Sequence, residues 1–200
     1  MKQTYYISNS CVIKNNVVFN NDALAFESDA GNFTTFAKAA YKNFEIEYPK
    51  FFKMDNLSKL AFLGSEMVLA KQQEKENIAL LFANKSASLD TDLKHQESIQ
   101  DKENFFPSPA IFVYTLANIC IGEVSIRHQL KTESAFFCSE SYQPAFMMNY
   151  ANYLLDKNKA TKVLCAWVEI INESYEAVFY LVEKQGKKQH TITEIEKIFI

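Results

Sequence analysis

Glycine and arginine are scarce in this chain of 200 amino acids. It contains 4 glycines, so a glycine-rich loop that cradles a phosphate is excluded. Arg127 is the single arginine, and the net charge is -3 at pH 7. No lysine cluster alternates with aromatic residues, so the sequence carries no signature of a protein that binds nucleic acid.

Cysteine is also sparse, with 4 residues that lie far apart in the sequence: Cys11, Cys120, Cys138 and Cys165. Their spacing matches neither a zinc knuckle nor a redox pair, which indicates buried thiols in a reducing compartment. The chain also has no run of about 18 apolar residues that could span a membrane, and its N-terminus lacks the apolar core of a signal peptide. We therefore expect a cytoplasmic protein without a membrane span.

The hydrophobic pattern predicts one domain over residues 1–200, of the α/β class. An apolar run over 78–83 is typical of a strand buried in a parallel sheet. Helical spacing of apolar residues precedes it over 57–70, after the possible caps Asp55 and Asn56. Strands over 162–171 and 175–182 are joined by a short turn, which predicts an antiparallel pair, and residues 5–13 and 16–19 predict a hairpin.

The stretch from Phe105 to Cys138 is the most informative part of the sequence. Ser108 and Pro109 are a helix-start signal, and the apolar spacing that follows predicts one helix that continues to Cys120. The run from Ala135 to Cys138 then predicts a strand covered on both faces, at the centre of the sheet.

The same stretch resembles the N-terminal half of the β-ketoacyl synthases, the condensing enzymes of the thiolase fold. The resemblance covers roughly residues 48–171 and is closest to the variant N-terminal domains of aryl-polyene and flexirubin-type pigment pathways. The matching residues are Leu116, Asn118, Gly122, Ser125, Ile126, Leu130 and Lys131. It implies a three-layer α/β/α half of a thiolase-like fold, with a mixed five-stranded sheet and an antiparallel edge strand.

In this family a nucleophilic cysteine follows the third strand, in a Thr-Ala-Cys motif at the start of a helix. The matching turn here reads Cys138, Ser139, Glu140, Ser141. Counted from Lys131, the nucleophile position falls near Ser141, and Cys138 comes about three residues early. A carboxylate at Glu140 would oppose formation of a thiolate, so the turn resembles a degenerate nucleophile site.

The resemblance also implies two catalytic histidines, which the family carries in its second half, beyond the end of this sequence. His95, His128 and His190 match neither histidine motif. Asp90, Asp92, His95 and Glu97 match no metal-binding loop, so neither a metal nor a cofactor is predicted.

Three functions remain open from the sequence. The first is a catalytically deficient ketosynthase-like protein that supports acyl-chain assembly, in the manner of a chain-length-factor subunit. As the resemblance implies, its third strand would pair across a dimer axis, in a homodimer or with a complete ketosynthase. An acyl carrier protein is a further candidate partner. The second is a small acyltransferase or thioesterase that uses Cys138 or Ser141. The third is a structural assembly protein without an acyl pocket.

Overall fold

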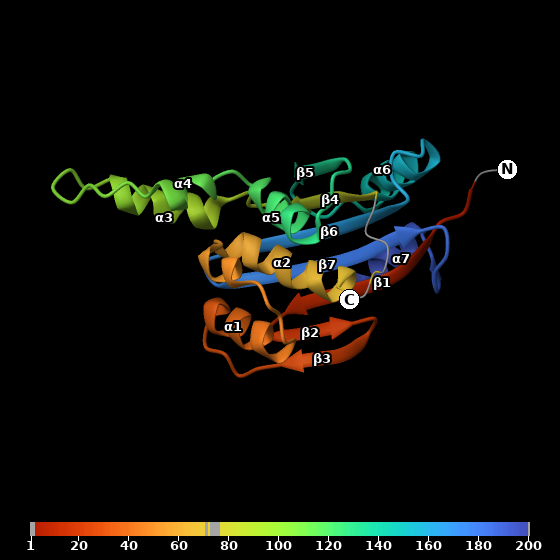
Figure 1. Cartoon of the computed structure of the whole chain (residues 1–200), viewed down its shortest axis with the longest axis horizontal. Helices are drawn as coiled ribbons and strands as arrows, with labels where there is room; N and C mark the ends of the chain where they lie inside the picture. Colours follow the sequence, from red (N-terminus) through yellow and green to blue (C-terminus); the bar gives the residue numbers. More distant parts are fainter. Residues whose placement is uncertain (1–2, 71, 73–76, 200) are drawn as a thin grey trace.

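A mixed sheet of eight strands organises the computed structural model, which describes residues 3–70, 72 and 77–199 (Figure 1). The strand order is β3-β2-β1-β7-β6-β4-β5, and β8 pairs with β1. The strands are β1 (Tyr6–Lys14), β2 (Val17–Asn20), β3 (Ala23–Glu27), β4 (Ile78–Asn84), β5 (Ser134–Cys138), β6 (Lys162–Ile171), β7 (Ser174–Glu183) and β8 (Lys188–Gln189).

Helices cover both faces of the sheet, which confirms the predicted α/β class and its three layers. One face carries α1 (Phe33–Asn43), the 3-10 helix η1 (Pro49–Lys53), α2 (Asn56–Leu69) and α5 (Ile119–His128). The opposite face carries α6 (Pro144–Asp156), α7 (Ile192–Glu196) and the 3-10 helix η2 (Lys197–Phe199). The remaining helices are α3 (Leu89–Ile99) and α4 (Pro109–Val113). No helix in the described ranges is both long enough and apolar enough to cross a bilayer.

The strand pairings confirm the predicted hairpins and change the arrangement of the sheet. Strand β4 is buried along its whole length and lies parallel to both β5 and β6. Strand β7 runs antiparallel to β6 and β1, and the edge strand β3 pairs antiparallel with β2, so the predicted antiparallel edge is present. The five strands β1, β7, β6, β4 and β5 form the expected sheet, and β2, β3 and β8 extend it.

Strand β5 lies at the edge of the sheet, so its predicted central position is wrong. Ser134 and Cys138 are exposed, and the three residues between them are half-buried. A short apolar run looks the same in sequence whether a neighbouring strand of the same chain or an absent partner covers it.

The predicted helix over 109–120 is also interrupted. Its start is confirmed, because the Ser108 hydroxyl accepts a hydrogen bond from the Ile111 amide, but α4 ends at Val113 and α5 begins at Ile119. Gly122 lies inside α5. The apolar residues that suggested one continuous helix do not enter the core, since Phe112, Val113 and Leu116 are each about half exposed.

Candidate functional site: the turn between β5 and α6

The turn from Cys138 to Ser141 lies where the carboxyl ends of parallel strands meet. Cys138 is in register with Asn84, the last residue of β4, and the Ser139 amide donates a hydrogen bond of 3.0 Å to the Asn84 carbonyl oxygen. The buried Asn84 side chain stabilises the turn that follows β4, because it donates to the Ala87 carbonyl oxygen and accepts from the Ala87 amide. The two strands therefore fix where the turn begins.

Ser139 and Ser141 both form hydrogen bonds within the turn. The Ser139 hydroxyl donates to the Ser141 carbonyl oxygen at 2.9 Å. The Gln143 side-chain amide donates to the Ser141 hydroxyl and to its carbonyl oxygen, each at 3.2 Å. The Ser141 hydroxyl thus accepts from an amide, and no described residue acts as a base toward it.

Glu140 and Cys138 both face solvent. The Glu140 carboxylate pairs with the Lys85 ammonium at 3.1 Å, and its side chain is 90% exposed. Cys138 is the one exposed cysteine of the four, and among the described residues its thiol has no hydrogen-bond partner. The helix α6 begins only at Pro144, so the thiol belongs to the end of the strand and not to the first turn of the helix.

Tyr142 anchors the turn to the protein interior, a contact that the sequence analysis missed. Its hydroxyl lies 2.6 Å from the Tyr180 hydroxyl on β7, and its ring stacks on Phe199 with centroids 4.5 Å apart. Burial raises the pKa of both tyrosines well above 10, so both stay neutral. The signal in the sequence was an aromatic residue inside a polar turn, directly before a helix start.

The three histidines lie apart from the turn. His128 is buried at the end of α5, with Nε2 3.0 Å from the Glu66 carboxylate. His190 lies 3.0 Å from the Asn152 side chain, and burial lowers its pKa to about 4. The His95 ring packs against Phe112. Within the described part of the chain, no hydrogen bond joins a histidine to Cys138 or Ser141, and no three metal-ligating side chains gather.

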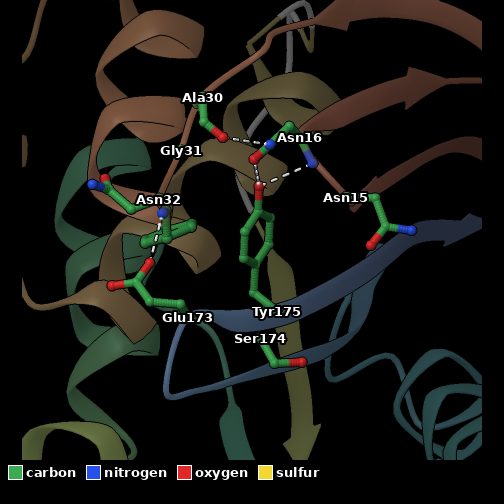
Figure 2. Close-up of a pocket in the computed structure, with 9 residues that line it drawn as sticks. Asn15, Asn16, Ala30, Gly31, Asn32, Glu173, Ser174 and Tyr175 are labelled. Atoms are coloured by element: carbon green, nitrogen blue, oxygen red, sulfur yellow. Dashed lines mark hydrogen bonds between the residues drawn. The ribbon is translucent and has the colours of Figure 1, made fainter.

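A separate polar pocket lies where the β1–β2 and β6–β7 turns meet the start of α1 (Figure 2). The Tyr175 hydroxyl donates to the Asn16 side chain at 2.6 Å, and Asn16 donates to the Ala30 carbonyl oxygen at 2.8 Å. The Glu173 carboxylate accepts from the Phe33 amide at 2.7 Å. These hydrogen bonds join the β1–β2 and β6–β7 turns to the segment that leads into α1.

The fold is the thiolase-like fold of ketosynthases. Solved structures with this fold include an ishigamide ketosynthase/chain length factor, with a TM-score of 0.68, 15% identity, and coverage of 90% of this chain and 62% of that chain. A ketosynthase in complex with its chain length factor from Xenorhabdus doucetiae has a TM-score of 0.61, 16% identity, and coverage of 92% and 81%. A β-ketoacyl synthase from Burkholderia phymatum STM815 has a TM-score of 0.62, 12% identity, and coverage of 92% and 60%.

The chain therefore spans 62% of the length of the ishigamide protein. No family model matches the sequence, and no curated protein matches it. At these low identities the similarity establishes the fold and leaves the function to be proposed.

Proposed function

We propose that this chain is a catalytically deficient ketosynthase-like protein that supports fatty-acid or polyketide-type acyl-chain assembly, in the manner of a chain-length-factor subunit. The observation that carries this proposal is the chemistry of the β5–α6 turn. A ketosynthase nucleophile needs a thiolate, and a base or a helix N-terminus to stabilise it. Here the position is occupied by an ion-paired Glu140 and by Ser141, which accepts a hydrogen bond from Gln143.

The partner in this role is a second subunit of the same fold, held at the β5 edge. Two of the solved neighbours are ketosynthase and chain length factor assemblies, and a third is described as a ketosynthase with its acyl carrier protein. The open edge of β5 and the apolar side chains around it support such a contact. The resemblance over roughly residues 48–171 is closest to the aryl-polyene and flexirubin-type variants, and it is the basis for proposing a role in such a pigment pathway.

The alternative is a small acyltransferase or thioesterase that uses Cys138 or Ser141. One observation favours it, because Cys138 is exposed at the carboxyl end of a parallel strand, where α/β enzymes place reactive groups. Such an enzyme also needs a base near the thiol, and the contacts of the turn provide none.

Decarboxylation of malonyl-acyl carrier protein distinguishes the two functions. We expect purified protein to release carbon dioxide no faster than its Cys138→Ala and Ser141→Ala variants, because no group in the turn activates a nucleophile. The assay compares the three proteins at equal concentration, with an active ketosynthase as the positive control. Decarboxylation by the unmodified protein that disappears in Cys138→Ala would show that the chain is an enzyme.

A further inference from the structure

The polar pocket between the β1–β2 turn, the β6–β7 turn and α1 is a small cavity with fixed walls (Figure 2). Its volume is about 240 Å³. Pockets for drug-sized ligands measure about 300–1,000 Å³, so a ligand here would be no larger than a small metabolite. The Asn16 amide donates to the Tyr175 hydroxyl at 3.0 Å, and the Tyr175 ring stacks on Phe36 with centroids 5.4 Å apart. Binding would therefore require little ordering of the protein.

Four polar groups that line the pocket have no partner within the described part of the chain. The side chains of Asn15 and Ser174 form no hydrogen bond there. Glu173 accepts a backbone amide of α1 through Oε2 alone, which leaves Oε1 for a ligand. Asn32 likewise accepts a backbone amide of α1 through Oδ1, which leaves Nδ2. All four side chains are exposed, so a molecule in solution can reach them.

The charge in the pocket is a single carboxylate that the protein already offsets in part. Glu173 is the one charged side chain among the described residues that line the pocket. Its carboxylate lies 2.7 Å from the amide nitrogen of Phe33, the first residue of α1. The positive end of the helix dipole is located there, so it lowers the demand for a further cation.

The unpartnered groups distinguish between classes of ligand. An anion would be repelled by the Glu173 carboxylate. A cation would pair with Glu173, but it would leave the amide N–H groups of Asn15 and Asn32 without an acceptor, which costs free energy. A hydroxyl group both donates and accepts, so a neutral ligand with several hydroxyl groups satisfies all four side chains.

We propose that this pocket binds a small neutral polyol, of the size of one sugar ring. Figure 2 shows Glu173 and Asn32 on one side of Tyr175 and Asn15 on the other. Hydroxyl groups of a ring that lies across Tyr175 donate to Glu173 Oε1 and Asn15 Oδ1, and they accept from Asn32 Nδ2. The site goes beyond the proposed function, because β6 and β4 separate β7 from β5 and its turn.

Titration of the full chain, followed by the side-chain amide signals of Asn15 and Asn32 in 15N–1H NMR spectra, tests the class of ligand. We expect D-glucose to shift both signals with a dissociation constant of about 1–10 mM, because small ligands gain little free energy per atom. Putrescine and inorganic phosphate, at the same concentrations, should leave both signals in place. The proposal is overturned if glucose causes no shift at ten times that concentration, or if either charged probe causes the larger shift.

Two variants and a matched control test the position of the site. Asn15→Gly removes only the side chain, because Asn15 has a φ of 50° that glycine adopts without strain. Glu173→Gln keeps an oxygen for the α1 amide and replaces the free oxygen with a donor. Each should raise the dissociation constant for glucose at least fivefold, measured on the Asn32 signal.

Asn158→Gly is the matched control for Asn15→Gly. Asn158 follows the end of α6, is exposed and has a φ of 52°, so the same change is made outside the pocket. This variant should bind glucose like the unmodified protein. Equal affinity in Asn15→Gly and Asn158→Gly would overturn the proposed site, whether or not Glu173→Gln folds.

Discussion

Glu66→Ala is expected to lower the free energy of unfolding by about 3–5 kcal/mol, because it removes one partner of a buried ion pair. The Glu66 carboxylate, whose side chain is 7% exposed, accepts from Arg127 Nε at 2.9 Å and from Nη2 at 3.1 Å. His128 Nε2 lies 3.0 Å from the same carboxylate. In the variant, the Arg127 charge would stay half-buried between α2 and α5 without its carboxylate.

Urea denaturation measures this effect, with Glu140→Ala as the matched control. Glu140 makes an exposed ion pair with Lys85, and such pairs contribute about 0–1 kcal/mol. The Glu66 variant should therefore unfold at a much lower urea concentration than the Glu140 variant. Equal urea midpoints for the two variants would show that the ion pair between Glu66 and Arg127 does not hold α5 against α2.

The contacts of Glu66 with Arg127 and His128 also make the stability of the fold depend on pH. Burial by itself would raise the Glu66 pKa, but hydrogen bonds from His128 and Arg127 outweigh it and lower the pKa from 4.5 to about 2. Because the folded pKa is depressed, the stabilisation is complete above pH 4.5 and is lost as the pH falls toward 2. Between these values the unmodified protein should lose stability faster than Glu66→Ala. Parallel profiles for the two proteins would contradict this assignment.

Gly64→Ala should destabilise the protein by about 1–3 kcal/mol, although alanine is the better helix former. Gly64 lies in α2 against β7, and a Cβ atom there would be 2.0 Å from Cε2 of the Phe179 ring. That ring is fully buried and packs edge-to-face on Phe82, so it has little room to move.

Gly122→Ala is the matched control for Gly64→Ala. It makes the same change inside another helix, α5, where a Cβ atom would meet no heavy atom within 4 Å. This variant should gain about 1 kcal/mol from helix propensity alone. Thermal unfolding should therefore shift in opposite directions for the two variants, and a shift in the same direction would contradict the close packing of α2 on β7.

Helices and strands whose caps, apolar pattern and turn residues all lie in the segment itself could be predicted from the sequence. Helix α2 has its cap at Asp55, which accepts from the Ser58 amide, and β4 is one uninterrupted apolar run. The turns of the β1–β2 and β6–β7 hairpins carry asparagine or glutamate at positive φ, which suits two-residue turns. In these segments the apolar period and the turn residues agree with the final packing.

Elements that depend on their neighbours could not be predicted. The sequence around Phe112 and Leu116 has a helical period, but these side chains lie exposed and the helix breaks between them. The apolar period of a segment does not reveal whether the surface that covers it belongs to the same chain. The edge position of β5 was missed for the same reason.

The turn residues themselves were predicted as the candidate site, but their contacts were not. Lys85, which pairs with Glu140, and Tyr180, which holds Tyr142, come from distant parts of the chain. Only the packing of β4, β5 and β7 brings them to the turn.

The most direct test of a non-catalytic ketosynthase-like role is acyl transfer to the β5–α6 turn, measured by intact-protein mass spectrometry with an acyl-pantetheine thioester. Because Cys138 is exposed and has no activating base, we predict that it is acylated no faster than free cysteine at the same pH, and that Ser141 is not acylated. Rapid formation of one acyl adduct per chain, abolished by Cys138→Ala or by Ser141→Ala, would contradict the account.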